Sequence, residues 1–431
     1  MICNNLSVNE KGHLCFAGVD VTGLAEKYAT PLYLLDEDKV RENCRIYMDA
    51  MKDSFGQTAL PLYAGKALCI KDIYRIMREE SMGIDVVSCG ELFTAKVAGF
   101  PMERAYFHGN NKTNADISYA MDAGIGYFVC DNCEELLAIE NEAATRGIKQ
   151  RILIRITPGI DPHTHKAIST GSVDSKFGAA IETGDAEFLV SLALKQPHID
   201  LMGYHCHIGS QIFETQPFLD ASDIMLTFIA HIRDRLGYTA TELNLGGGMG
   251  VRYLEEHPTV DYAKNIQEIA EHMRAVCDRL SLDMPAVRME PGRSIVANAG
   301  LTLYTVGALK TIPGFRNYVS VDGGMPDNPR YALYQAPYTI LLANRMNEEA
   351  DTVCTVAGRC CESGDLIQEG VSLPQPHRND ILAVLTTGAY NYAMASNYNR
   401  IPRPAMVRLS HGEDTLILKR ESFEDLIRNE L

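Results

Sequence analysis

The sequence lacks a surplus of positive charge and any long apolar segment. Its 40 lysines and arginines are outnumbered by 56 acidic residues, which leaves a net charge of −16. This balance argues against nucleic acid or an anionic membrane as the main partner. No run is apolar enough to span a membrane, and the first residues, MICNNLSVNEKGHL, lack the basic start and apolar stretch of a secretory signal. We therefore expect a cytoplasmic protein.

Paired cysteine motifs are also scarce. Twelve cysteines are scattered along the chain, and the one C-x-x-C is Cys130 with Cys133. Without a second such pair, this spacing does not make a four-thiolate zinc site, and we interpret it as chance. The pattern indicates reduced thiols in a cytosol-like compartment.

The length of 431 residues predicts two domains. From residue 31 to about 293, short β-type runs alternate with segments of helical spacing, which predicts a parallel sheet and, with about eight units, a closed (β/α)8 barrel. Nine such runs are present, so we expect the first to be an entry segment outside the barrel. The runs are 31–36, 59–66, 83–90, 105–110, 127–131, 151–156, 201–207, 241–248 and 286–292.

After residue 300 the pattern changes to β-rich runs with few helical segments between them: 301–312, 317–324, 351–358, 380–387, 404–410 and 414–420. This predicts an all-β second domain, a β-sandwich or β-barrel, completed by the N-terminal segment. The predicted domains are therefore a barrel over 31–298 and a β-rich domain formed by 1–30 and 299–431.

Lys66 lies in the apolar run PLYAGKAL (61–68), at the predicted end of a strand. A buried amine with a lowered pKa is suited to form an imine with an aldehyde such as pyridoxal 5'-phosphate. The alternative is a lysine paired with a carboxylate inside the barrel. Lys166 and Lys176, in the long polar segment 157–180, are rival candidates that we expect to be solvated.

Three further motifs fall at predicted strand ends, where the active sites of such barrels lie. The glycines of NLGGGMG (244–250) would let backbone N–H groups approach a phosphate, although a tight turn is the alternative. In HIGSQ (207–211), Ser210 is a possible phosphate donor and His207 a ring that could stack on a cofactor. In MEPGRS (289–294), Glu290 would keep a pyridine nitrogen protonated and Arg293 would bind an anion, unless the two form a turn and a surface pair.

Together these motifs resemble the diaminopimelate decarboxylases, which belong to the alanine-racemase-like fold type III of pyridoxal-phosphate enzymes. The resemblance extends from about residue 30 to 410, in the family's order, and rests on LYAGKA, SCGEL, FHGNNK, HCHIGSQ, NLGGGMG, EPGRS, DGGMPDNPRYALY, CESGD and GAYNYAMASNYN. It implies a homodimer with active sites at the interface.

The resemblance also implies roles for individual residues. Lys66 matches the lysine that carries the cofactor, His207 the residue stacked on its ring, and Glu290 the partner of its nitrogen. Cys361 and Glu362 match a pair that a neighbouring subunit contributes, and we expect Cys361, rather than Cys360, to protonate the carbon from which CO2 is lost. The residues matched to the phosphate site are Ser210, Gly246, Gly247, Gly248, Gly292, Arg293 and Tyr390.

The implied reaction is the conversion of meso-2,6-diaminopimelate to L-lysine and CO2, the last step of lysine biosynthesis. This substrate carries a second carboxylate and a second ammonium, and Arg330, Tyr334 and Glu362 would recognise them, together with Arg293 and Tyr390. The alternative is the decarboxylation of a related substrate: ornithine, lysine, arginine or carboxynorspermidine.

Three other functions compete with this interpretation. A metal-dependent hydrolase is suggested by HCH (205–207), which places two imidazoles on one strand face, but later strand ends offer no further histidines. A regulatory homologue without activity should have lost Lys66 or the glycines of NLGGGMG, and this sequence keeps both. A racemase on this fold would have a cation at the ring nitrogen, where this sequence has Glu290. We therefore expect no metal.

Overall fold

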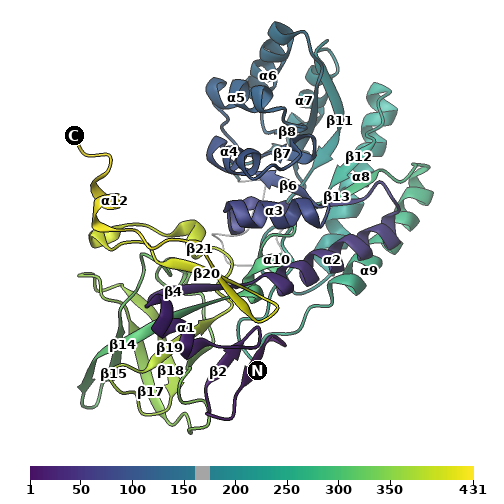
Figure 1. Ribbon diagram of the computed structural model, residues 1–431. Coiled ribbons are helices and arrows are strands. Elements are labelled where there is room, and N and C mark those ends of the chain that lie inside the picture. Colours follow the sequence, from purple (N-terminus) through teal and green to yellow (C-terminus); the bar gives the residue numbers. More distant parts are fainter. Residues whose placement is uncertain (161–174) are drawn as a thin grey trace. The chain divides into compact units, whose positions relative to one another are not determined.

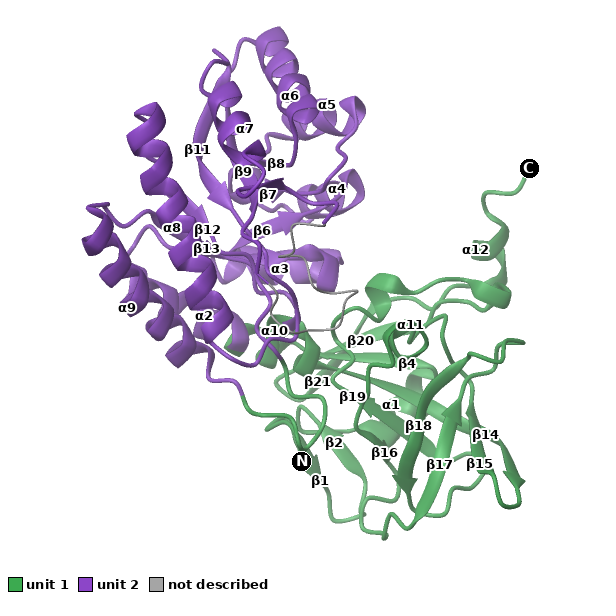
Figure 2. Ribbon diagram, turned by 180° about the vertical axis from the view of Figure 1, so that it is seen from behind, with its two compact units in different colours: residues 1–42, 251–259, 294–431 green, residues 43–250, 260–293 purple. Residues whose placement is uncertain are grey.

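The computed structural model describes residues 1–160 and 175–431 (Figure 1). These residues form two compact units, shown in Figure 2: unit 1 comprises 1–42, 251–259 and 294–431, and unit 2 comprises 43–250 and 260–293. The units differ from the predicted domains in three stretches, 31–42, 251–259 and 294–298, which group with the β-rich part. No helix among the described residues is long and apolar enough to cross a membrane.

Unit 2 is a closed barrel of eight parallel strands. The pairing of β8 with β9 closes the ring. A short strand, β10 (Ala179–Ala180), pairs with the C-terminal end of β9. All eight strands coincide with sequence runs predicted for the barrel. They are β5 (Leu60–Ala64), β6 (Gly83–Val86), β7 (Ala105–Phe107), β8 (Tyr127–Cys130), β9 (Gln150–Thr157), β11 (Ile199–His205), β12 (Glu242–Asn244) and β13 (Ala286–Met289).

A helix follows each barrel strand, because each polar strand end is succeeded by a segment with one apolar face. Several of these helices begin with a side-chain cap: Ser88 accepts a bond from the Glu91 N–H, and Asn132 one from the Glu135 N–H. The helices are α3 (Lys71–Glu79), α4 (Cys89–Val97), α5 (Asn114–Ala123), α6 (Cys133–Arg146), α7 (Asp185–Ala193), α8 (Gln216–Leu236), α9 (Tyr262–Leu280) and α10 (Arg293–Val296).

Unit 1 is built on a second, nine-stranded sheet. Its central strand is β14 (Gly300–Ile312), which pairs with β4 (Leu32–Asp36), β15 (Arg316–Val321) and β19 (Ile381–Leu385). The remaining strands are β16 (Ile340–Leu342), β17 (Thr352–Ala357), β18 (Leu366–Leu373), β20 (Ala405–Ser410) and β21 (Glu413–Leu418). Two short helices, α11 (Arg330–Tyr334) and α12 (Phe423–Ile427), complete this part.

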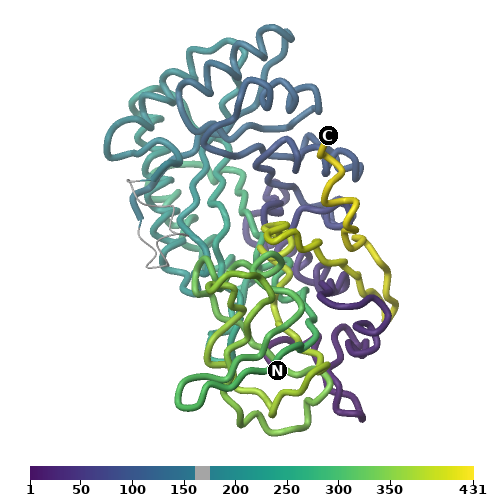
Figure 3. The backbone as a smooth tube through the Cα atoms, turned by 90° about the vertical axis from the view of Figure 1, so that its left-hand side faces the viewer, coloured from purple at the N-terminus to yellow at the C-terminus, as the bar shows by residue number. Residues whose placement is uncertain are grey.

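The N-terminal residues are part of unit 1. Strand β4 runs parallel to β20 and antiparallel to β14, so the run 31–36 lies outside the barrel, as predicted. Figure 3 shows this N-terminal segment, in purple, beside green and yellow strands of the C-terminal part. A shared core of buried side chains includes Leu14 and Phe16 with Leu301, Leu385 and Val407. The N-terminal elements are β1 (Leu6–Val8), β2 (Leu14–Phe16), β3 (Val19–Asp20) and α1 (Val21–Tyr28).

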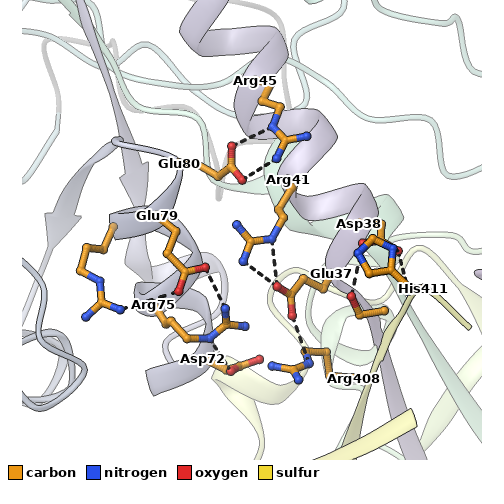
Figure 4. A network of polar contacts seen from close by, with 12 residues as sticks. Glu37, Asp38, Arg41, Arg45, Asp72, Arg75, Glu79, Glu80, Arg408 and His411 are labelled. Atoms are coloured by element: carbon orange, nitrogen blue, oxygen red, sulfur yellow. Dashed lines mark hydrogen bonds and ion pairs between the residues drawn. The ribbon is translucent and has the colours of Figure 1, made fainter. Parts of the chain in front are cut away.

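Helix α2 (Glu37–Phe55) begins in unit 1 and continues into unit 2. Within unit 1, buried Glu37 accepts hydrogen bonds from Arg41 Nε at 2.9 Å and Nη2 at 2.6 Å, and Arg408 Nε lies 3.1 Å from its other oxygen. Within unit 2, Arg45 and Glu80 form two parallel bonds of 2.9 Å each (Figure 4). Glu37 thus joins the first turn of the helix to β20, and Arg45 joins its middle to the residue after α3.

Strands β11 and β12 of the barrel approach each other so closely at Gly203 that a larger residue there should destabilise the fold. A Cβ on Gly203 of β11 would lie 1.8 Å from the Glu242 carbonyl oxygen, which belongs to rigid strand backbone. Gly203→Ala should therefore lower the free energy of unfolding by about 1–3 kcal/mol or more, measured by urea titration with circular dichroism. Gly90→Ala is the matched control, because its Cβ would meet no atom closer than 3.6 Å. An equal loss in both variants would contradict the steric explanation.

Candidate active site in unit 2

The side chains predicted at strand ends are found there. Since the carboxyl ends of parallel strands open on one side of a closed barrel, these residues surround a single mouth. Each ends a strand or follows it within four residues: Lys66, Ser88, His108, Asp131, His205, His207, Gly246, Gly247, Gly248 and Glu290. Arg293 follows on the first turn of α10.

Glu290, directly after β13, is buried and contacts three polar side chains. His108 Nε2 lies 2.9 Å from Oε1, His205 Nε2 lies 3.2 Å from Oε2, and the Asn244 amide donates to Oε1 at 2.7 Å. Burial alone would raise the pKa of Glu290, but contact with the two imidazoles lowers it well below its usual range. Glu290 is therefore a carboxylate at neutral pH.

His207 is held by the glycine turn. Its Nδ1 accepts a hydrogen bond of 3.2 Å from the Gly247 N–H. Burial, followed by the positive charges of Lys66 and Arg155, lowers the pKa of His207 well below its usual value. The ring is consequently neutral, its proton is on Nε2, and its orientation is fixed.

The three glycines after β12 are required sterically. A Cβ on Gly247 would lie 2.1 Å from the Glu290 carbonyl oxygen, and one on Gly248 would lie 2.5 Å from that of Gly209. Two of their N–H groups have protein acceptors: that of Gly246 bonds Asn244 Oδ1 at 2.9 Å, and that of Gly247 bonds His207. Among the described residues, no acceptor is found for the Gly248 N–H, which leaves it to bind an anion.

A cation lies beside this turn. Buried Arg293 donates to Ser210 Oγ from Nε at 3.3 Å and from Nη2 at 3.0 Å. Gly292 brings this segment close to β5, since a Cβ on it would lie 2.8 Å from that of Ala64. Arginine, serine hydroxyl and backbone N–H are the donors that phosphate sites use.

The expectation that Lys66 is buried was wrong. Gly65 and Ala67 are buried, but the Lys66 side chain is exposed, because it lies in the 3₁₀ turn Gly65–Ala67 at the strand end rather than in β5. Burial raises the pKa values of Asp85 and Glu91, that of Glu91 to about 7. The positive charge of Lys66 acts on both carboxyl groups in the opposite direction. Lys66 is therefore a reachable amine close to two carboxyl groups.

A lysine that is buried near the barrel strands is Lys112, and it is neutralised. Its ammonium donates to Glu135 at 2.8 Å and to the carbonyl oxygens of Gly109 and Val129. Of the rival lysines, Lys176 is exposed, as expected, and Lys166 lies outside the described residues.

The remaining predicted residues belong to unit 1. Arg330 is buried: its Nη1 donates to the Tyr338 hydroxyl at 2.9 Å, and its guanidinium lies 4.9 Å from the ring centre of Tyr253. Among the described residues it has no carboxylate partner. Half-buried Tyr390 has a φ of 61°, a left-handed conformation that is strained for an aromatic residue and is often found at functional sites.

Cys361 and Glu362 are exposed, in the segment between β17 and β18. The Cys361 N–H donates to Asn399 Oδ1 at 2.7 Å, and Glu362 accepts a bond of 3.4 Å from the Tyr398 hydroxyl. Burial and the nearby Asp365 raise the pKa of Cys360 to about 12, so this thiol stays protonated. Tyr334, on α11, is half-buried.

Comparison with known proteins identifies the family. The pyridoxal binding domain of pyridoxal-dependent decarboxylases matches residues 38–297. The diaminopimelate decarboxylase of Bacillus subtilis is 45% identical over 423 residues, 98% of this chain and 96% of that protein. The chain belongs to the diaminopimelate decarboxylase family. The enzyme of that name from Halalkalibacterium halodurans is 47% identical over 429 residues, with 98% and 96% covered.

Solved structures agree with this family membership. The diaminopimelate decarboxylase of M. jannaschii, in complex with L-lysine, has a TM-score of 0.90 and 33% identity, covering 99% of this chain and 98% of that one. That of Helicobacter pylori, also complexed with L-lysine, has a TM-score of 0.86 and 33% identity, covering 95% and 99%. The lysine/ornithine decarboxylase of Vibrio vulnificus, 23% identical with a TM-score of 0.75, shares the fold alone.

The residues present fit the cofactor of this family, pyridoxal 5'-phosphate. The glycine turn, which a Cβ would fill, lies with Arg293 and Ser210 and suits a phosphate. The buried anion Glu290 suits a protonated pyridine nitrogen, and Lys66 offers an amine.

The hypothesis of a metal-dependent hydrolase predicted a pair of histidines that the structure does not bring together. HCH (205–207) suggested that His205 and His207 act together, but His207 turns to Gly247. His205 instead lies with His108 and Glu290, and their ligand atoms are within 4.8 Å of one another. The Glu290 carboxylate lies between the two imidazoles.

Sequence reasoning missed the contribution of Asn244 and gave His108 no role. Both lie at predicted strand ends, and that position was the available signal. Their common target could not be predicted, because it depends on how strands far apart in sequence are paired around the barrel.

His205 gives this site a predictable response to acid. Burial lowers its pKa to about 4, so the folded protein rejects a proton that the unfolded chain accepts below pH ~6.5. Stability is therefore lost as the pH falls from about 6.5 to about 4. His205→Gln, which cannot titrate, should reduce the loss of unfolding free energy between about pH 7.5 and about pH 5 by roughly 2 kcal/mol. Urea titrations measure this, with exposed His231→Gln as the control; identical pH dependence in all three proteins would contradict it.

Proposed function

We propose that the protein converts meso-2,6-diaminopimelate to L-lysine and CO2 with pyridoxal 5'-phosphate, as the last step of lysine biosynthesis. Family membership supports the reaction and the cofactor. The observation that carries the substrate assignment is Arg330, a buried guanidinium without a carboxylate partner among the described residues. A buried charge needs a counter-charge, and the second carboxylate of this substrate provides one.

We assign the cofactor to the barrel residues. When bound, pyridoxal phosphate supplies an aldehyde for amines and a ring that delocalises the electron pair left by CO2. Lys66 would offer the amine that attaches it, His207 would lie against its ring, and Glu290 would hold a proton at the ring nitrogen. The barrel residues that would hold the phosphate are Ser210, Gly246, Gly247, Gly248, Gly292 and Arg293; the resemblance adds Tyr390, which belongs to unit 1.

We assign recognition of the far end of the substrate to Arg330, Tyr334 and Glu362, with Arg293 and Tyr390 completing the site. Arg330 binds the second carboxylate through parallel hydrogen bonds, and Glu362 binds the second ammonium. Decarboxylases of ornithine, lysine or arginine need no such cation, because their substrates have no second carboxylate.

Cys361 is our candidate for the acid that returns a proton to the carbon losing CO2. Its exposure in the segment between β17 and β18 fits a thiol offered to the site of a second subunit. We therefore propose a homodimer in which Cys361 and Glu362 complete the partner's site. The twelve free cysteines fit a reducing, cytoplasmic location.

The proposed reaction is tested by a substrate panel on the unsubstituted protein with pyridoxal phosphate. Lysine and CO2 should form from meso-diaminopimelate, with little product from lysine, ornithine, arginine or carboxynorspermidine. A preference for any of the other four would overturn the substrate assignment.

The role of Arg330 predicts a specific defect. Arg330→Ala should lower kcat/KM for meso-diaminopimelate by about 30-fold or more, mainly through KM, since loss of a buried charge pair costs about 2–5 kcal/mol. Cofactor affinity, measured by absorbance titration, should stay unchanged. Arg316→Ala is the control, because Arg316 is exposed and paired with Glu369. A parallel loss of cofactor in Arg330→Ala would show that this arginine supports the fold instead.

The shared site predicts complementation between inactive chains. A heterodimer of Lys66→Ala and Cys361→Ala chains should contain one intact site out of two, and so recover about half of the activity of the unsubstituted dimer. Separately tagged chains, purified through both tags, allow the measurement. A heterodimer as inactive as its parents would place Lys66 and Cys361 of one chain in the same site.

A further inference from the structure

Glu290 contacts polar side chains from three different barrel strands. His108 follows β7, His205 ends β11 and Asn244 ends β12, and their contacts to the carboxylate measure 2.9, 3.2 and 2.7 Å. All four side chains are buried. The two oxygens are thus held from separate directions, which fixes the plane of the carboxylate.

Without these donors the carboxylate would not be stable as an anion. A carboxyl group removed from water takes up a proton unless charges or hydrogen bonds compensate for the lost hydration. The Asn244 amide supplies one bond and no charge. The two imidazoles supply the rest, provided that each carries a proton on Nε2.

The surroundings of His205 favour that tautomer. Its Nδ1 is buried and has no hydrogen-bond partner among the described residues, whereas its Nε2 faces Glu290. In a neutral ring with one proton, the nitrogen next to an anion carries it. His205 is therefore a fixed donor.

His108 faces two carboxyl groups and is closer to Glu290. Its Nε2 lies 2.9 Å from Glu290 Oε1 and 3.9 Å from Asp85 Oδ1. The short contact to Glu290 lacks hydrogen-bond geometry in this structure, so His108 acts there as a close polar neighbour that a small rotation of its ring would turn into a donor. Burial raises the pKa of Asp85, which disfavours a second anion beside Glu290. The other titratable groups whose charges act on Glu290 or share its surroundings are Arg155, Cys206, His207 and Lys66.

We propose that His108 and His205 are positioning residues that hold Glu290 as an oriented anion and thereby keep the cofactor's ring nitrogen protonated. This inference rests on the proposed function only in requiring the cofactor, not the identity of the substrate. On this inference, His108 and His205 do not touch the cofactor, yet they control how readily its ring accepts electrons.

The test compares variants that keep or remove the donor. Gln places an amide N–H near the position of the imidazole Nε2–H, and Leu places none, so His108→Gln and His205→Gln are matched to His108→Leu and His205→Leu. His198→Leu is the control, since it breaks another histidine–glutamate contact of unit 2, 2.8 Å between His198 and Glu140. Circular dichroism and cofactor content establish that each variant is folded and loaded.

The readout is the ¹⁵N resonance of the ring nitrogen in protein loaded with ¹⁵N-labelled pyridoxal phosphate, followed from about pH 6 to about pH 9 without substrate. The unsubstituted protein, both Gln variants and His198→Leu should show a protonated nitrogen throughout. Each Leu variant should lose this proton within that range of pH. A nitrogen still protonated in both loaded Leu variants would overturn the inference.

A second measurement covers Leu variants that fail to fold or to bind the cofactor. In the unsubstituted protein labelled with ¹⁵N-histidine, the Nε2 atoms of His108 and His205 should both be protonated, with the Gln variants assigning the resonances. An unprotonated Nε2 on either residue would overturn the inference while leaving the proposed reaction intact. Failure of the unsubstituted protein to bind pyridoxal phosphate would instead overturn the proposed function, and the inference with it.

Discussion

A carboxylate inside a protein stays charged only where other groups replace the water it has lost, and the site in unit 2 is organised around one such carboxylate. Glu290 contacts His108, His205 and Asn244, and its backbone N–H donates to the Gly246 carbonyl at 2.8 Å. The same residue therefore joins the pair of imidazoles to the glycine turn. The anion and the turn are parts of one structure.

This arrangement depends on closure of the barrel. The contacts to Glu290 come from the ends of β7, β11 and β12, and residues far apart in the sequence meet only because β8 pairs with β9 and completes the ring. Gly247 and Gly248 then allow the turn after β12 to approach neighbouring backbone, where a side chain would collide. Close approach at the strand ends and a buried anion with polar contacts to both of its oxygens are consequences of the same packing.

Periodicity and turn residues were sufficient to predict the eight barrel strands and the position of each site residue at a strand end. They did not predict β16, which is only three residues long, or β18, whose sequence LIQEGVSL (366–373) has polar residues and a glycine between its buried positions. An apolar run suggested a buried Lys66, yet a 3₁₀ turn exposes it. Lys112 is buried instead, and its partner Glu135 comes from another β/α unit. Side-chain partners of this kind follow from the fold and not from local sequence.

The central claim is that Glu290 is ionised although it is buried. Infrared difference spectroscopy measures this directly, by comparing the unsubstituted protein with Glu290→Gln after ¹³C labelling of glutamate. The account predicts that the difference spectrum contains the carboxylate bands of one ionised glutamate from about pH 8 down to about pH 5. A protonated carboxyl band at neutral pH would contradict it.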